Sequence, residues 1–175
     1  MLSIIVVFWM YVILFAIIGG MRGWAKELLV SFSVILALTF TTLLMNYVKF
    51  FQTLLTAQPE FYFWFHTLVL GLLVFFGYQT PSMPRFATKA AREKVQDILL
   101  GAVLGGINGY LIAGTTWYYL HTAGYPFPKV VQPPPPELLD KIEQMIKFMP
   151  PQLLGIPSIY FAVVIAFIFV LVVFI

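Results

Sequence analysis

The sequence contains no cysteine and few charged residues. The absence of cysteine excludes disulfides, thiolate metal sites and a cysteine nucleophile, and it removes the usual indication of redox compartment. Charged residues make up only 10% of the 175 residues, whereas soluble domains carry roughly a quarter. Because 61% of the residues are hydrophobic and the mean hydropathy is +0.95, water cannot be the main solvent of the chain. These features predict an integral membrane protein.

The ten basic and seven acidic residues are confined to short segments, so long stretches of the chain are uncharged. A helix needs roughly 20 apolar residues to cross a hydrocarbon core of about 30 Å. The stretches long enough to cross are residues 1–21, 28–48, 61–84, 98–128 and 148–175. We therefore expect an all-helical bundle of four or five transmembrane helices. The first helix should be retained, because no basic segment of a signal peptide precedes it.

The pattern divides the chain into three parts. Residues 1–120 are expected to form a four-helix transmembrane domain, residues 121–157 a proline-rich connector, and residues 158–175 a final span. The prolines at 133–136 favour polyproline II. Residues 137–149 place apolar side chains on one face and charged side chains on the other, which predicts an amphipathic helix on the membrane surface. A second short surface helix is expected at 85–97.

The basic residues predict the orientation in the bilayer. If the amino terminus is outside, the connectors after the first and third spans face the cytoplasm and hold six of the ten basic residues. Cytoplasmic loops usually carry this excess. The six are Arg22, Lys26, Arg85, Lys89, Arg92 and Lys94, and the four on the other side are Lys49, Lys129, Lys141 and Lys147. The net charge of +3 is thereby explained by topology, and we expect no nucleic-acid partner.

Glycines recur every four residues in the fourth expected span, at Gly101, Gly105 and Gly109, with Gly106 beside them. This spacing places three glycines on one stripe, where the backbone of another helix can approach closely. A packing seam inside the bundle is the favoured interpretation, and an interface between copies or with a partner is the alternative. Asn108 in the same span is expected to hydrogen-bond between helices, although it could instead line a polar path.

A second pattern lies between the first two spans and comprises Arg22, Gly23, Trp24, Lys26 and Glu27. The glycines at 19, 20 and 23 predict a short turn that ends the first span. Arg22 and Glu27 should anchor this turn at the membrane surface and form a salt bridge. Asp97, on the same predicted side, offers Arg22 a second partner, and its charge suits a helix amino terminus. An Arg22–Asp97 pair would tie the first helical hairpin to the second.

Together the two patterns resemble the colicin V production protein (CvpA) family. Its members carry an Arg-Gly, aromatic, basic-Glu motif after the first helix, which residues 22–27 match. They also have an aspartate followed by glycines four, eight and twelve residues on, matched by Asp97 and the three stripe glycines. Ile98 and Asn108 stand where relatives often have arginine. The resemblance covers about residues 1–120, and it implies a small bacterial inner-membrane protein linked to envelope homeostasis and export.

His66 and His121 are expected at the outer ends of the third and fourth spans. They could ligate a haem or chlorin, but we expect interfacial hydrogen bonding, no cofactor and no metal. The sequence contains no nucleotide-binding loop, nucleophile triad or carboxylate pair, so we do not predict an enzyme. The centres of the expected spans also lack ionisable residues, which argues against a proton-coupled transporter of the usual kind.

Three functions are consistent with these observations. The favoured one is a non-enzymatic scaffold or accessory protein in the lipid bilayer, which associates with other membrane proteins or with itself through the glycine helix. The second is a pore or transport subunit, formed by copies packed along the glycine stripe. The third is an accessory subunit of a large photosynthetic or respiratory complex, in which the two histidines would contact pigments, quinones or partner helices.

Overall fold

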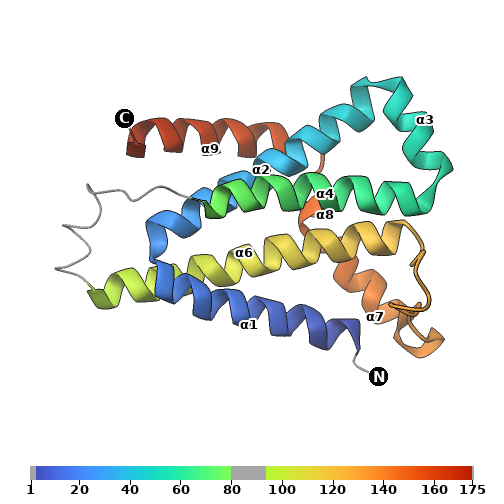
Figure 1. Ribbon diagram of the computed structural model, residues 1–175, viewed down its shortest axis with the longest axis horizontal. Helices are drawn as coiled ribbons and strands as arrows, with labels where there is room; N and C mark the ends of the chain where they lie inside the picture. The colour runs from blue at the N-terminus through green and yellow to red at the C-terminus, as the bar shows by residue number, and fades with distance from the viewer. Residues whose placement is uncertain (1–2, 80–93, 175) are drawn as a thin grey trace.

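The computed structural model describes residues 3–79 and 94–174, and within these ranges the regular structure is entirely helical. Four helices are long, namely α1 (Ile4–Arg22), α2 (Trp24–Tyr47), α4 (Pro59–Tyr78) and α6 (Lys94–Thr122). The shorter ones are α3 (Lys49–Ala57), α7 (Pro136–Lys147), α8 (Pro150–Leu153) and α9 (Ser158–Phe174). Figure 1 shows their arrangement.

The four long helices are each long and apolar enough to cross a membrane. They contain 19, 24, 20 and 29 residues, and a span needs about 17 to 25. Helix α9 is apolar as well but shorter, with 17 residues. The predicted all-helical membrane fold is therefore confirmed, with four candidate spans and an additional apolar helix at the end of the described chain.

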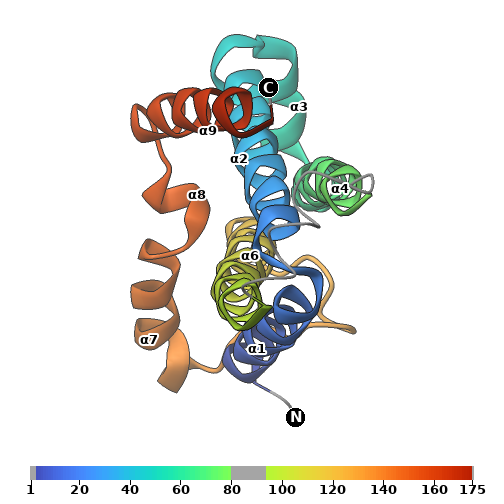
Figure 2. The same cartoon turned by 90° about the vertical axis from the view of Figure 1, so that its left-hand side faces the viewer.

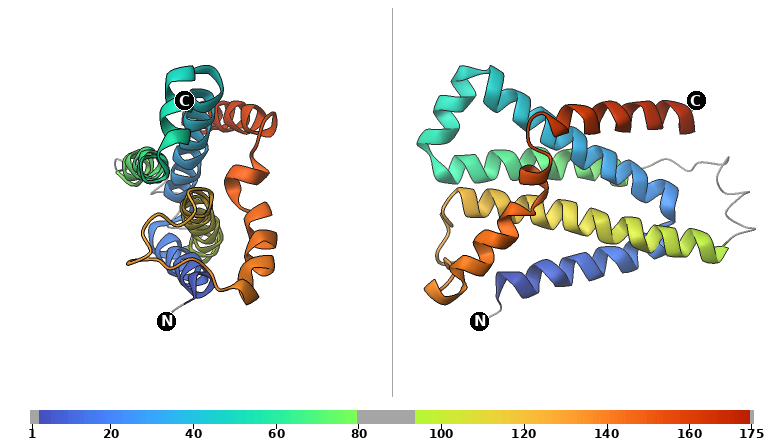
Figure 3. Two further views of the ribbon diagram at one scale, coloured as in Figure 1. Left: turned by 90° about the vertical axis from the view of Figure 1, so that its right-hand side faces the viewer. Right: turned by 180° about the vertical axis from the view of Figure 1, so that it is seen from behind.

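Helix α6 is the centre of the bundle. It lies between α1 on one side and α2 and α4 on the other, and it packs against all three (Figures 1 and 2). Helix α9 packs mainly on α2. The views from behind and from the side show that the amino terminus, α3 and α7 gather at one end of the bundle, while the α1–α2 turn lies at the other (Figure 3).

Two clusters of buried side chains form the core. The first lies where α2, α4, α6 and α9 meet, and contains Val34, Ala37, Leu38, Leu70, Tyr119 and Ile159. The second joins α1, α6 and the segment around α7, and contains Phe8, Trp117, Ile142, Ile146 and Met149. Large apolar side chains remain exposed along the outer faces of the long helices. That distribution is expected where lipid, rather than water, surrounds a bundle.

Helix α1 does not end at its paired glycines, as the sequence interpretation expected. It continues through Gly19 and Gly20 to Arg22, and the break falls at Gly23, whose φ is +87°. Only glycine adopts this backbone conformation readily. The close approach of α6 to α1 at Gly19 provides the packing that offsets the low helix propensity of glycine.

The two expected surface helices have different outcomes. The amphipathic pattern at 137–149 forms α7, but two residues of its apolar face, Ile142 and Ile146, pack with Phe8 and Trp117. This part of the face is therefore covered by protein rather than by lipid. The surface helix expected at 85–97 lies mostly outside the described residues, and its last four residues, 94–97, belong to α6.

Candidate functional site

The glycine stripe of α6 lies directly against α1. A Cβ atom added to Gly105 would lie 2.8 Å from the Cα of Gly19, and one added to Gly19 would lie 2.6 Å from the Cα of Gly105. A Cβ on Gly101 would collide with the carbonyl oxygen of Gly19. These neighbours are backbone atoms, which cannot rotate away. The two helices can therefore approach this closely only because all three positions are glycine.

The contact continues toward the other end of α1. A Cβ on Gly109 would lie 2.9 Å from the Cα of Val12, whereas one on Gly106 would lie 3.5 Å from the Cβ of Ala16, an ordinary contact distance. Gly109 therefore belongs to the tight part of the seam, and Gly106 lies at its edge. Because α1 covers the stripe, a partner helix or a second copy would have to displace α1 to reach it.

Asp97 caps the start of α2 from across the bundle. Gly23 occupies the N-cap position of α2 and has no side chain to accept a hydrogen bond. The backbone N–H of Trp24 instead donates to Oδ1 of Asp97 at 3.2 Å. A Cβ on Gly23 would lie 2.8 Å from the Asp97 carboxylate, so the missing side chain also makes room for it. A carboxylate at this position accepts a hydrogen bond from an N–H that has no acceptor within its own helix. Its negative charge also interacts favourably with the positive end of the helix dipole.

Arg22 pairs with Glu27 and not with Asp97. Its Nη1 lies 2.5 Å from Oε1 of Glu27, its Nη2 donates to the backbone oxygen of Tyr78 at 3.2 Å, and its guanidinium carbon lies 4.2 Å from the centroid of the Tyr78 ring. The expected pairing with Asp97 does not form because that carboxylate binds the amino end of α2. Arg22 instead connects the first hairpin to α4.

Glu27 lies inside the bundle rather than at its mouth, where the sequence interpretation placed it. Its side chain is 0% exposed, and so is that of Asn108, midway along α6. Nδ2 of Asn108 donates to Oε2 and to the backbone oxygen of Glu27, both at 2.8 Å. Oδ1 of Asn108 accepts a hydrogen bond from Oγ of Ser31 at 2.7 Å. Asn108 therefore does hydrogen-bond between helices, and its partners are both on α2.

We define the polar cluster as Arg22, Glu27, Ser31 and Asn108. Its members use their polar side-chain atoms mainly on one another. Both carboxylate oxygens of Glu27 have a partner, and the amide of Asn108 uses its nitrogen and its oxygen. A satisfied buried network of this kind makes the packing of its helices more rigid and more specific. The cluster thus links α1, α2 and α6 through hydrogen bonds and an ion pair. Lys26, the remaining basic residue of the motif, is exposed.

Three participants were not identified from the sequence. Ser31 follows Glu27 by four residues, so helical spacing alone places it on the same face. Gly19 precedes Gly23 by four residues, which repeats the spacing of the stripe on α6. Both signals were available in the sequence. Tyr78 had no local signal, because it is 56 residues from Arg22 along the chain.

The two histidines are held by aromatic neighbours. His66 is buried, its Nδ1 lies 2.8 Å from the backbone oxygen of Tyr62, and its ring centroid lies 4.2 Å from that of Tyr62 and 4.5 Å from that of Tyr119. His121 Nδ1 lies 3.3 Å from the hydroxyl of Tyr125. Within the described ranges, no group of three or more metal-binding side chains is present.

Span-length helices, a glycine seam and a buried polar cluster define a multi-pass membrane protein. A family model described as Colicin V production protein matches residues 3–133, and the chain belongs to that family. The resemblance inferred from the two motifs is thereby confirmed. No catalytic domain is known in this family of membrane proteins. No curated protein and no solved structure matches the chain.

Proposed function

We propose that the chain is a non-enzymatic scaffold or accessory protein of the bacterial inner membrane, which acts by lateral association with other membrane proteins. The observation that carries this proposal is the closed polar cluster. Enzyme sites combine reactive groups with a cavity that admits substrate. Glu27 and Asn108 are buried and use their polar atoms on one another, on Arg22 and on Ser31. The cluster thus supports a structural role rather than turnover.

The association surface is proposed to lie away from the glycine stripe, because α1 covers that stripe within one chain. Helix α9 is the candidate. It is buried against its neighbours at Ile159 and Ala166, and it presents Phe161 and Ile165 outward. These two exposed side chains are one helical turn apart and form part of an apolar ridge. Packing of such ridges is a main source of helix association in lipid, where the hydrophobic effect contributes little.

Family membership and the distribution of basic residues support the proposed location and orientation of the chain. Membership of the colicin V production protein family supports a place in envelope homeostasis or export. The excess of basic residues in the connectors after the first and third spans supports an amino terminus on the outer side. Lys26 is exposed at the end of the bundle where α1 meets α2, which is the end proposed to face the cytoplasm.

Purification of the affinity-tagged chain in mild detergent, followed by native electrophoresis and mass spectrometry, tests the proposal. We expect a stoichiometric complex with another membrane protein, recovered again when the tag is moved to that partner. Replacing Phe161 and Ile165 with alanine should dissociate it, whereas the same change at Ile13 and Ile17, which are comparably exposed on α1, should not. A homo-oligomer alone would favour the pore hypothesis, and a monomer without a partner would contradict the scaffold.

A further inference from the structure

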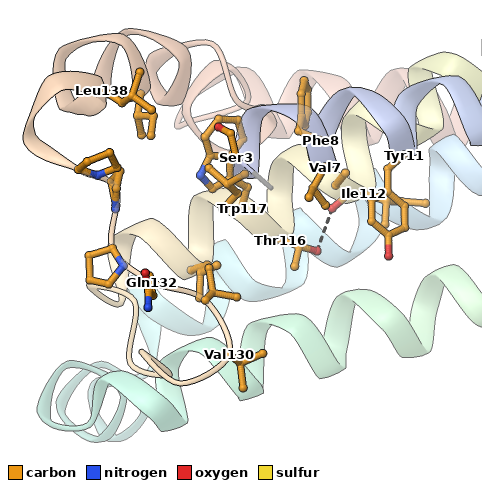
Figure 4. Close-up of a pocket in the computed structure, with 18 of the residues that line it drawn as sticks. Ser3, Val7, Phe8, Tyr11, Ile112, Thr116, Trp117, Val130, Gln132 and Leu138 are labelled. Carbon is orange, nitrogen blue, oxygen red and sulfur yellow. Dashed lines mark hydrogen bonds between the residues drawn. The ribbon is translucent and has the colours of Figure 1, made fainter. Parts of the chain in front are cut away.

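An apolar groove lies at the end of the bundle opposite the α1–α2 turn. It has a volume of about 1010 Å³ and is bounded by α1, the last turns of α6, the connector between α6 and α7, and α7 itself (Figure 4). Small-molecule sites usually occupy about 300 to 1,000 Å³, so the groove is large enough for a substantial ligand. None of the residues of the polar cluster lines it.

The groove is about as deep as one leaflet of a membrane. Its wall on α1 extends from Ser3 to Phe15, which is about 18 Å at roughly 1.5 Å per residue. Half of a hydrocarbon core of about 30 Å is about 15 Å. On α6 the wall extends from Ile112 to Leu120. The groove therefore begins at the end of the bundle and stops near the middle of α1.

The charge of the lining is confined to one end of this depth. Toward the middle of the bundle the wall consists of side chains such as Phe8, Phe15 and Ile112. The hydroxyl of Thr116, which also lies in the wall, donates to the backbone oxygen of Ile112 at 2.9 Å and so needs no polar ligand (Figure 4). At the bundle end the connector contributes Lys129, the one charged residue among those that line the groove.

The connector also gives the groove a firm outer wall. Pro133, Pro134 and Pro135 line it, and Pro135 has φ −64° and ψ 152°, the polyproline II conformation. Such a segment loses little conformational freedom when a ligand binds. Because the connector crosses the end of the groove, a partner helix of full membrane length would run into it. The shape therefore fits a ligand confined to one leaflet.

We propose that this groove binds one anionic phospholipid from the leaflet that it faces, with an acyl chain along Phe8 and Ile112 and the phosphate beside Lys129. A cation at the headgroup end and an apolar wall one leaflet deep are complementary to that molecule. The lining contains no acidic side chain that would repel the phosphate. The groove should therefore select lipid by headgroup. This inference is independent of any protein partner.

Trp117 provides a probe inside the groove. It lines the wall and is only 3% exposed, whereas Trp9 and Trp64 face outward. A variant with phenylalanine at Trp9, Trp24 and Trp64 is reconstituted in phosphatidylcholine nanodiscs that contain phosphatidylglycerol brominated on its acyl chains. We expect brominated phosphatidylglycerol to reach half-maximal quenching of Trp117 fluorescence at about fivefold lower mole fraction than brominated phosphatidylcholine does. One lysine near an anionic lipid is expected to give a preference of this size. Native mass spectrometry of the wild-type chain should show one retained phosphatidylglycerol.

Two variants locate the lipid, and a third serves as a control. Lys129→Gln should abolish the preference for phosphatidylglycerol, while Lys147→Gln, at an exposed lysine of α7 that does not line the groove, should preserve it. Ala113→Phe fills part of the groove and should remove the retained lipid. Equal quenching by the two lipids, an unchanged preference in Lys129→Gln, or a retained lipid in Ala113→Phe would each overturn the proposal.

Discussion

At the scale of single residues, Glu27 is a fully buried carboxylate. A carboxylate without solvent contact is tolerated only when it is paired and hydrogen-bonded. Arg22 supplies the positive charge to one of its oxygens and Asn108 donates to the other. The side chain of Arg22 is still 20% exposed, so the cation keeps some contact with its surroundings while the anion has none.

Replacing Arg22 with glutamine should leave Glu27 as an uncompensated buried charge. Loss of one partner of a buried pair typically costs about 3 to 5 kcal/mol of unfolding free energy. Adding Glu27→Gln removes the orphan charge, so the double variant should be more stable than Arg22→Gln alone. The measurement is a double-mutant cycle of unfolding in mixed detergent micelles. Lys26→Gln, at an exposed position, should change the stability by no more than about 0.5 kcal/mol. Additive effects of the two glutamines would show that the pair is not coupled.

At the scale of elements, the helices were largely predictable and their mutual contacts were not. Uncharged stretches located all four long helices, and α2 begins at Trp24, as expected from the glycine turn that precedes it, so that Lys26 and Glu27 form part of its first turn. Local sequence also predicted the Arg22–Glu27 pair. It could not predict that Asp97 caps α2, since Trp24 is 73 residues away and the contact depends on how closely α1 and α6 approach.

Enlarging Gly105 should separate α1 from α6. In Gly105→Leu the new side chain would meet the backbone of Gly19, and overpacking typically costs about 1 to 3 kcal/mol. Thermal unfolding in detergent, followed by circular dichroism, measures the loss. Gly71→Leu is a matched control in α4, because a Cβ there meets nothing within 4 Å, and Val103→Leu controls for the exposed face of α6. Equal melting temperatures for all three variants would rule out a tight seam.

Charged residues on the buried face of α7 should detach it from the bundle. Ile142→Asp combined with Ile146→Asp places two carboxylates in the apolar cluster that contains Phe8 and Trp117, and burying charge among apolar side chains is costly. We expect faster proteolysis of residues 136–149 and a lower melting temperature. Leu139→Asp, on the more exposed side of the same helix, should leave both nearly unchanged. If the double variant resists protease as the wild type does, α7 is not held by these contacts.

At the scale of the whole molecule, the bundle has two distinct ends. One end holds the α1–α2 turn, and the other holds α3, α7 and the connector between α6 and α7 (Figure 3). From the distribution of basic residues, we predict that the first end faces the cytoplasm. The loops of the sequence predict an orientation, whereas the position of α6 at the centre of the bundle became evident only from the packing.

Single cysteines should report the orientation without background, because the chain has none. A cysteine at Gln132, in the exposed connector, should react with an impermeant maleimide in intact cells. A cysteine at Ala91, in the basic segment between the third and fourth spans, should react only after permeabilisation. Labelling at Ala91 but not at Gln132 in intact cells would invert the topology, and labelling of both would contradict the arrangement of spans.

The central claim is that α1 of the same chain covers the glycine stripe of α6, and a cysteine pair across the seam tests it most directly. A Cβ at Gly106 lies 3.5 Å from the Cβ of Ala16, within the range of about 3.5 to 4.5 Å found in disulfides. In oxidised membranes, Ala16→Cys with Gly106→Cys should give an intramolecular disulfide in a monomer. Ala16→Cys with Val103→Cys, on the exposed face, should give none. Disulfide-linked dimers of the first pair, or two free thiols, would contradict the account.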